Sequence, residues 1–312
     1  MEIVPVWVWA SFLAFMLAMM ALDLGVFNRK AHVVSMREAG IWTFVWVSLA
    51  LIFGLGVWKE MGQAKALEFY TGYLIEESLS VDNLFVFLVL FRFFKVPPRF
   101  QHRVLVWGII GAIIMRMVMI LAGTAAITRW HWIIYVFGAF LIWTGAKLMF
   151  QDGEAVDPRH NPAVKLLRRF FPISHGYHGG HFFVRRKSGA LVATMMMAVV
   201  LVVETTDVAF AVDSIPAVFA VTRDPFIVFT SNMFAIMGLR SVFFLLAGLL
   251  PRFHFLRHGL SLVLIFIGAK MLSEKYIDIP IQASLGVVGT IIGGAIILSW
   301  ITSGKRGRTL KG

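Results

Sequence analysis

The amino-acid sequence predicts an all-α polytopic membrane protein of about nine transmembrane helices with two inverted three-helix repeats. Three observations support this fold class. Of the 312 residues, 59% are hydrophobic and 15% are charged, whereas soluble domains have about 45–50% apolar and about 25% charged residues. Apolar windows long enough to cross a bilayer follow one another closely along the chain. Blocks of similar sequence also recur in the same order, which indicates an internal duplication.

The apolar windows predict helices, because each is too long for an ordinary strand and lacks the alternating pattern of a membrane β-barrel. The first window is expected to remain in the membrane and not to be a cleaved signal peptide. Glu2 is the only charged residue before it, and its basic pair, Arg29 and Lys30, follows it. The nine expected spans lie near 6–27, 41–58, 69–92, 104–123, 131–150, 191–220, 226–249, 255–272 and 283–302.

The net charge of +12 is explained by orientation in the bilayer, so no nucleic-acid partner is expected. With the N-terminus outside, the loops assigned to the cytoplasm hold 20 Lys and Arg and the outer loops hold 5. Cytoplasmic loops carry such an excess, which predicts an outer N-terminus and a cytoplasmic C-terminus. The expected regions are two N-terminal helices (1–68), a first repeat (69–150), a cytoplasmic loop (151–190), a second repeat (191–272), and a last helix with a basic tail (273–312).

The repeat is visible in three pairs of blocks. "EESLSVDN" (76–83) resembles "DVAFAVDS" (207–214), and "RMVMILAG" (116–123) resembles "RSVFFLLAG" (240–248). "FLIWTGAKLM" (140–149) resembles "VLIFIGAKML" (263–272) in the same way. Three crossings in each copy would turn the second copy upside down relative to the first. Inverted repeats are a recurrent plan of secondary transporters, although a duplication without functional meaning would leave the same trace.

Acidic residues inside these apolar windows need an explanation, because a carboxylate at the centre of a membrane helix costs roughly 2.5–3.5 kcal/mol. Glu77 is set aside, since the second copy has Val208 at that place. Five acids then face two bases, Arg116 and Arg240. Ion pairs that only hold the bundle together can neutralise two acids. A divalent cation and a proton would neutralise the remaining three, so ion handling is the favoured interpretation.

The candidate ligands are all oxygens, which suits a hard divalent cation such as magnesium, calcium or manganese without ranking them. On a straight helix the six-residue spacing of Asp207 and Asp213 would splay the two carboxylates apart. Either each carboxylate meets a different partner, or the helix breaks, as Pro216 suggests. The predicted metal ligands are Glu76, Asp82, Glu204, Asp207 and Asp213, supported by Asn83, Ser214, Asn232, Arg116 and Arg240.

Other chemistries are excluded or disfavoured. The chain has no Cys, so thiol redox chemistry and thiolate metal sites are excluded. Nothing resembles a nucleotide-binding phosphate loop, and no His lies deep in a span, which argues against a membrane hydrolase. We therefore expect a protein that is not an enzyme and has no resident cofactor.

The same residues resemble the TerC/Alx family of integral membrane proteins. The resemblance covers nearly the whole chain and is strongest in "GYLIEESLSVDNLFVF" (72–87), "RVLVWGIIGAIIMR" (103–116), "HFFVRR" (181–186), "VETTDVAFAVDSIPAVFAVTRDPFIVFTSNMFAIMGLR" (203–240) and "FIGAKML" (266–272). It implies a bacterial inner-membrane protein that exports manganese from the cytoplasm, with the acidic positions named above as its site. Glu77 departs from the pattern of many relatives.

The combined expectation is a secondary transporter that exports manganese(II) through an intramembrane carboxylate site, with proton coupling as an additional hypothesis. The alternative is a non-transporting membrane partner that helps secreted proteins acquire metal or supports the envelope and metal stress response. Its working surface would be the cytoplasmic loop 151–190. The sequence leaves the direction of transport to the resemblance, and it leaves the oligomeric state open.

Overall fold

The computed structural model describes residues 4–22, 35–150, 162–174, 176–185, 190–246, 255–277 and 279–309, and this part of the chain is almost entirely helical. A 3₁₀ turn at His178–Gly180 and two short strands are the exceptions. The elements are α1 (Val6–Leu22), α2 (Met36–Met61), α3 (Gln63–Phe93), α4 (Pro98–Arg129), α5 (Ile133–Phe150), α6 (Pro162–Phe170), β1 (Phe183–Arg185), β2 (Leu191–Ala193), α7 (Met195–Phe219), α8 (Pro225–Leu246), α9 (Leu256–Ser273) and α10 (Ile281–Thr309).

Every window expected to cross the membrane contains a helix. Among the described residues, seven helices are long and apolar enough to span a bilayer: α2, α4, α5, α7, α8, α9 and α10. Helix α1 is apolar but has 17 residues. Helix α3 has 31 residues, yet the acids Glu76, Glu77 and Asp82 keep it outside that set. The prediction of an all-α polytopic membrane protein is confirmed at this level.

The chain divides into two compact units, each assembled from three separate stretches. Unit 1 comprises Met1–Ser35, Val86–Ile114 and Ala155–Val208, and unit 2 comprises Met36–Phe85, Met115–Glu154 and Ala209–Gly312. The long helices α3, α4 and α7 contribute one part to each unit. The two units are described separately below.

Small residues bring α5 and α9 together within unit 2. A Cβ atom built on Gly268 would lie 2.6 Å from the Gly138 carbonyl oxygen, and one built on Gly145 would lie 2.9 Å from the Ser261 carbonyl oxygen. The Ser261 hydroxyl also donates to the Gly145 carbonyl. Because Gly138 meets Gly268 while Gly145 meets Ser261, the two helices run antiparallel. Backbones this close are typical of membrane helices that pack through small residues.

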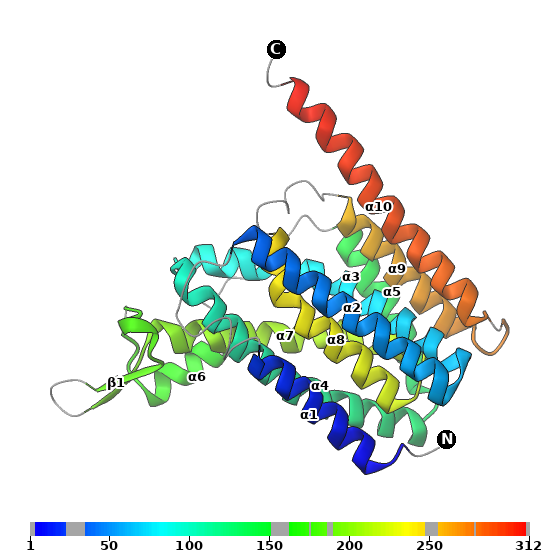
Figure 1. Ribbon diagram of the computed structural model, residues 1–312, viewed down its shortest axis with the longest axis horizontal. Coiled ribbons are helices and arrows are strands. Elements are labelled where there is room, and N and C mark those ends of the chain that lie inside the picture. The colour runs from blue at the N-terminus through cyan, green and yellow to red at the C-terminus, as the bar shows by residue number, and fades with distance from the viewer. Residues whose placement is uncertain are drawn as a thin grey trace. The chain divides into compact units, whose positions relative to one another are not determined.

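The other helices of unit 2 extend this packing. Helix α2 lies along α8, and α10 lies beside α9 (Figure 1). Gly72 of α3 fits between two neighbours, since a Cβ there would lie 3.0 Å from the Ser231 hydroxyl of α8 and 3.2 Å from Val218 of α7. Helices α3, α7 and α8 therefore meet closely at Gly72. With the orientation that the sequence predicts, this position would lie in the outer half of the bilayer.

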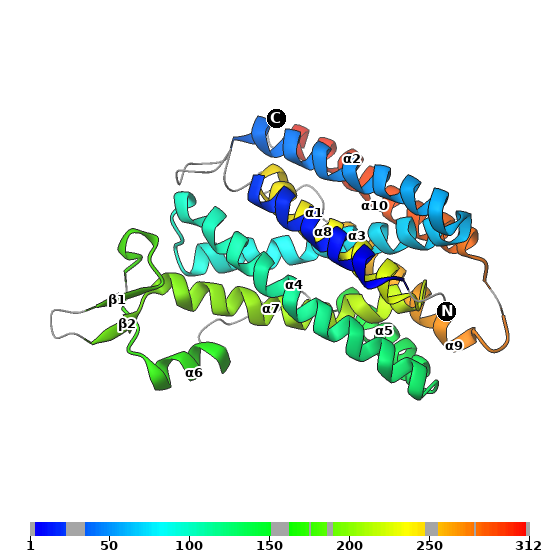
Figure 2. The same cartoon turned by 60° about the horizontal axis from the view of Figure 1, so that its bottom comes forward.

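Unit 1 contains the segment before α7, which forms a small folded element. Strands β1 and β2 pair antiparallel, with Phe183 opposite Ala193, and α6 lies next to them (Figure 2). The Tyr177 hydroxyl donates to the Phe94 carbonyl at 2.7 Å, and its ring stacks on Phe100. Burial raises the pKa of this hydroxyl to about 12, so it remains a donor at neutral pH. The contact fastens this element to the end of α3.

The expected break at Pro216 is wrong. Helix α7 continues through Pro216 to Phe219, and the amide of Ala220 donates to the Pro216 carbonyl at 3.2 Å. The proline lies in the last turn, where its missing amide affects only the carbonyl of Val212 and leaves three residues to follow. Helix α3 is likewise continuous from Gln63 to Phe93. The carboxylates spaced by six residues therefore lie on unbroken helices.

We expect Gly268→Val to destabilise the protein by about 1–3 kcal/mol, because the larger side chain would be forced into the Gly138 backbone. Thermal unfolding in detergent, followed by the loss of the monodisperse peak in size-exclusion chromatography, measures the effect. Gly286→Val on α10 is the matched control, since open space surrounds that position. Equal thermal stability of the two variants would contradict the tight α5–α9 contact.

Candidate functional site

A buried ion pair stands at the centre of unit 2. Arg116 of α4 has 0% of its surface exposed and Glu76 of α3 has 1%. The Arg116 Nη1 atom donates to Glu76 Oε1. It also donates to Asn232 Oδ1 of α8 at 3.1 Å, and the Ser214 hydroxyl of α7 donates to Glu76 Oε1 at 3.1 Å. Four helices thus contribute one polar side chain each.

This cluster, Glu76, Arg116, Ser214 and Asn232, contains unused hydrogen-bonding capacity. Glu76 Oε2 and Asn232 Nδ2 are buried and have no protein partner. Buried polar groups nearly always find a partner, and a water or an ion commonly supplies it where the protein does not. The oxygen could coordinate a cation or accept from water, whereas the amide nitrogen could donate to water. Two atoms of opposite hydrogen-bonding character therefore remain available inside the bundle.

Asp213 has different surroundings. It lies one residue before Ser214 on α7, and Thr144 of α5 approaches its Oδ1 atom at 3.5 Å, a long contact. Lys147, one turn further along α5, is close enough to interact with the carboxylate electrostatically. The carboxylate is half-buried, and it forms no close ion pair with any residue that the structure describes. Asp213 is consequently less constrained than Glu76.

Glu204 and Asp207 belong to unit 1 and lie one turn apart on α7, where their charges repel each other. The Glu204 carboxylate occupies the space that a side chain on Gly111 of α4 would fill. One turn earlier on α4, a Cβ on Gly108 would lie 2.8 Å from Val203. Asp207 is 4% exposed. Glu204 is thus held against a glycine surface of α4, and Asp207 is buried one turn further along α7.

Glu76 is brought together with the predicted supporting residues Arg116, Ser214 and Asn232. Asn83 is buried, and the side chains of Asp82 and Arg240 lie outside the described set. Among the described residues, no group of three or more His, Asp or Glu side chains forms a metal-holding cluster. The site of five carboxylates remains a prediction. Among the predicted acids and bases, the structure shows the ion pair of Arg116 with Glu76, which links two helices of the bundle.

Glu77, which the comparison of the two repeats set aside, lies near Gly238. A Cβ atom built on Gly238 of α8 would be 3.8 Å from Glu77 Oε2 and 3.8 Å from Trp46 of α2. The Oε2 atom of Glu77 and the Nε1 atom of Trp46 are both buried without a partner. This carboxylate therefore faces α8 near α2.

Two residues near the acids were not identified from the sequence. Gly111 has a signal in hindsight, because Gly108 and Gly111 are three residues apart in "WGIIGAIIMR", on one face of a helix. Thr144 has none, since a threonine in an apolar helix usually bonds to its own backbone. Only the approach of α7 gives Thr144 its contact with Asp213.

Comparison with known proteins identifies the family of the chain. Residues 61–307 match the family described as "Integral membrane protein TerC family". The chain belongs to the TerC family. No solved structure matches it.

Relatives from several bacteria align with this TerC-family chain along almost its full length. An "Uncharacterized membrane protein STKORF319" of Myxococcus xanthus is 52% identical over 295 residues, which cover 95% of this chain and 92% of that protein. A "Putative membrane-bound redox modulator Alx" of Escherichia coli K12 is 46% identical over 303 residues, 94% of each chain. A membrane protein of Rickettsia bellii is 38% identical over 284 residues, 91% of this chain and 94% of its own.

We expect Arg116→Met to destabilise this TerC-family protein by about 3–5 kcal/mol, because it leaves the Glu76 carboxylate buried without its cation. Adding Glu76→Gln should recover most of that loss, since the remaining buried group is then neutral. Thermal unfolding in detergent measures both variants. Arg129→Met, at the exposed end of the same helix, should change the melting temperature little. A double variant as unstable as Arg116→Met alone would argue against the pair.

Proposed function

We propose that this chain is a secondary transporter that exports manganese(II) from the cytoplasm of a bacterium. It would be a multi-pass protein of the inner membrane with nine spans, an outer N-terminus and a cytoplasmic C-terminus. The observation that carries the proposal is the buried cluster of Glu76, Arg116, Ser214 and Asn232, with its unpartnered oxygen and amide. Ionisable residues inside a membrane bundle are functional by default, because their insertion is costly.

Inverted repeats are part of the proposal, and pairs of contacts support them. An offset of 123 residues relates "FLIWTGAKLM" to "VLIFIGAKML", and it converts Gly138 into Ser261 and Gly145 into Gly268. If each residue of the contact between Gly138 and Gly268 is replaced by its equivalent in the other repeat, the result is a contact between Ser261 and Gly145. This second contact is also present. Two antiparallel helices that exchange their contacts in this way are what an inverted repeat requires.

The first helices of the repeats give a corresponding expectation. The offset of 131 residues converts Glu76 into Asp207 and Ser214 into Asn83, and the matching arginine blocks convert Arg116 into Arg240. The cluster at Glu76 would then have a counterpart built from Asp207, Asn83 and Arg240. Two such clusters near the midplane, one from each repeat, supply acids of both copies to a transported ion.

The proposed mechanism exchanges a transported cation with a guanidinium as the partner of the carboxylates. Manganese enters from the cytoplasm and is bound by Asp207, Asp213 and Glu204 together with Glu76 and Asp82. When the cation leaves, Arg116 and Arg240 neutralise the acids, as Arg116 does for Glu76 in the described geometry. The ion pair prevents a buried carboxylate from remaining uncompensated, which lowers the barrier to returning without a cation.

Proton uptake by the same acids would reset the site and supply the driving force. This hypothesis follows from the acid surplus, because two arginines and one divalent cation leave one carboxylate unneutralised. Export should then accelerate when the outer pH is lowered relative to the inner pH. Transport that is insensitive to collapse of the pH gradient would exclude proton coupling while leaving the cation site intact.

We expect Asp213→Asn to abolish manganese flux, or to lower it by at least about two orders of magnitude, because it removes one charged ligand of the cation. The measurement is manganese uptake into proteoliposomes that contain the purified protein. Protease protection determines the orientation of the protein in these vesicles. Glu60→Gln is the control. Glu60 is exposed at the end of α2, so this substitution removes one negative charge outside the bundle, as Asp213→Asn does inside it.

Flux in the wild type and in Glu60→Gln, with loss in Asp213→Asn at matched thermal stability, is the expected result. Flux retained by Asp213→Asn would overturn the role of this carboxylate. Absence of flux from the wild type under both a pH gradient and a membrane voltage would overturn the transporter proposal.

The second candidate is a non-transporting membrane partner, and the folded element before α7 favours it. The contact of Tyr177 with Phe94 and the placement of Arg103 over the Phe182 ring give this element a defined surface. The redox role named for the Escherichia coli relative could not proceed here by thiol–disulfide exchange, because the chain has no Cys. If this candidate holds, Tyr177→Phe and Phe182→Ala should impair cellular metal tolerance more than Asp213→Asn does.

A further inference from the structure

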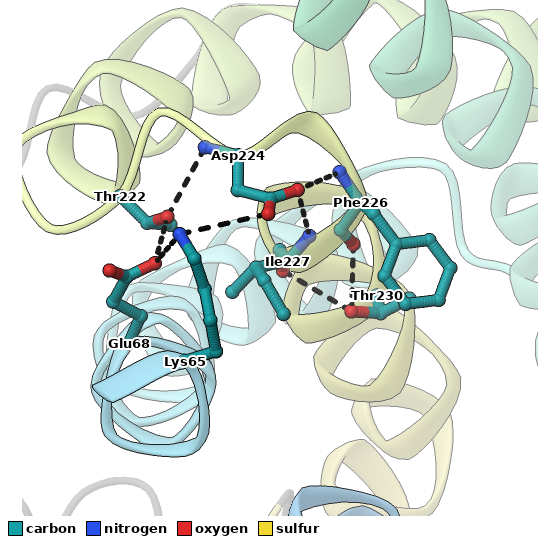
Figure 3. A network of polar contacts seen from close by, with 7 residues as sticks. All are labelled: Lys65, Glu68, Thr222, Asp224, Phe226, Ile227 and Thr230. Atoms are coloured by element: carbon teal, nitrogen blue, oxygen red, sulfur yellow. Dashed lines mark hydrogen bonds and ion pairs between the residues drawn. The ribbon is translucent and has the colours of Figure 1, made fainter. Parts of the chain in front are cut away.

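A polar network links the beginning of α3 to the connection between α7 and α8. The Lys65 ammonium lies 2.7 Å from Glu68 Oε2 and 3.6 Å from Asp224 Oδ2, and the Thr222 hydroxyl donates to the same Glu68 oxygen (Figure 3). Asp224 also caps α8 by accepting from the amide of Phe226 at 3.0 Å. One ion pair, Lys65 with Asp224, and one hydrogen bond, Thr222 with Glu68, thus link α3 to the α7–α8 connection at the end of the bundle that the proposed orientation puts outside.

A cavity of about 380 Å³ lies next to this network within unit 2. Its charged lining consists of two acids and two bases: Glu68 of α3, Arg223 of the α7–α8 connection, Lys270 of α9 and Glu274 directly after α9. Arg223 forms an ion pair with Glu274, and Lys270 donates to the Ser284 hydroxyl of α10 at 2.9 Å. Glu274 is therefore neutralised by a base from another segment, and Glu68 by Lys65 of its own helix.

The floor of the cavity is apolar. Phe219, the last residue of α7, lines the cavity and is 4% exposed. Its ring stacks on Phe137 of α5 with centroids 6.3 Å apart, and a Cβ on Gly123 of α4 would lie 2.6 Å from it. Along α7, Phe219 stands about 9 Å beyond Asp213 at 1.5 Å per residue. An aromatic plug thus separates the cavity from the level of the acids.

We propose that this cavity is the release chamber of the transport route, a second site for a hydrated divalent cation whose carboxylates are Glu68 and Glu274. The inference rests on the proposed function and names where the exported ion leaves. In the described geometry Phe219 closes the route from the chamber to the acids. The pair of Arg223 with Glu274 and the contact of Thr222 with Glu68 hold the end of α9 and the start of α3 to the α7–α8 connection.

The size and chemistry of the cavity fit this ligand. At about 30 Å³ per water, the volume corresponds to roughly a dozen waters, enough for a divalent cation with its hydration shell. Carboxylates are the preferred ligands of such cations, often through water. A cation that arrives would replace Arg223 as the partner of Glu274 and compete with Thr222 for Glu68, which loosens the contacts of the α7–α8 connection with α9 and α3. Arrival and opening would thereby be coupled.

The absence of native Cys permits a direct test by cysteine labelling. Ile215→Cys places a thiol one turn below Phe219 on the same face of α7, at a position 3% exposed. The full-length protein in right-side-out vesicles is treated with a membrane-impermeant thiol reagent, with and without manganese inside. Tyr276→Cys, at a position 84% exposed after α9, reports labelling that needs no opening.

We expect Ile215→Cys to react slowly from outside and faster when manganese is loaded. Arg223→Glu should raise its rate roughly three- to tenfold, because attraction to Glu274 becomes repulsion. Exchanging both charges, Arg223→Glu with Glu274→Arg, should return the rate to that of the parent. The manganese-dependent increase should disappear when Asp213→Asn is added.

Glu274→Gln separates a release site from a simple latch. It should raise labelling of Ile215→Cys, since the pair with Arg223 is lost, yet lower manganese flux roughly three- to tenfold, since the cation also loses a ligand. A residue that only closes the chamber would increase both or leave flux unchanged. Glu60→Gln, an acid outside the cavity, should change neither quantity.

Three results would overturn the inference. In the first, the labelling rate of Ile215→Cys changes neither with manganese nor with the charge at position 223, while Asp213→Asn still abolishes flux. The proposed function would then stand without this chamber. Another is labelling of Tyr276→Cys only from the cytoplasmic side, which would make the cavity an entrance. The third is unchanged flux in Glu274→Gln. Flux retained by Asp213→Asn would instead defeat the proposed function itself.

Discussion

The ion pair between Arg116 and Glu76 is the interaction on which the centre of unit 2 depends. Both groups are buried, so each would carry an uncompensated charge if the other were absent. The pair recruits Ser214 and Asn232 and thereby links α3, α4, α7 and α8 through one carboxylate and one guanidinium. In the proposed transport mechanism a divalent cation, which carries a higher charge than the guanidinium, would replace Arg116 as the partner of Glu76.

Two pairs of helices, α3 with α7 and α5 with α9, pack antiparallel in this structure. Glu76 contacts Ser214 and Glu68 contacts Thr222, eight residues apart on each side, so α3 and α7 run in opposite directions past each other. Helices α5 and α9 do the same through Gly138, Gly145, Ser261 and Gly268. One pair meets through polar side chains and the other through backbone. The polar contacts are thus concentrated on α3 and α7, while α5 and α9 provide close packing.

The sequence predicted the helices well because an apolar window of membrane length has one stable outcome in lipid. It also indicated that Glu76 and Arg116 are buried. The break at Pro216 was wrong because a proline in the last turn costs a helix little, and where that turn ends depends on packing. The neighbours of Asp213 and Glu204, Thr144 and Gly111, could not be predicted, since each is defined by the approach of another helix. Asp82 and Arg240 were predicted from the repeat and lie outside the described side chains.

The contact of Gly111 with Glu204 has a consequence for reading mutational scans. The carboxylate occupies volume that belongs, in any other residue, to a Cβ atom on α4. Even the addition of one methyl group at Gly111 would displace an acid on α7, although the glycine itself carries no charge, hydroxyl or metal ligand. A scan of activity would therefore score an inert residue as essential. Conversely, an activity lost at Gly111 and regained by shortening Glu204 to Asp would identify the carboxylate as the group that had been moved.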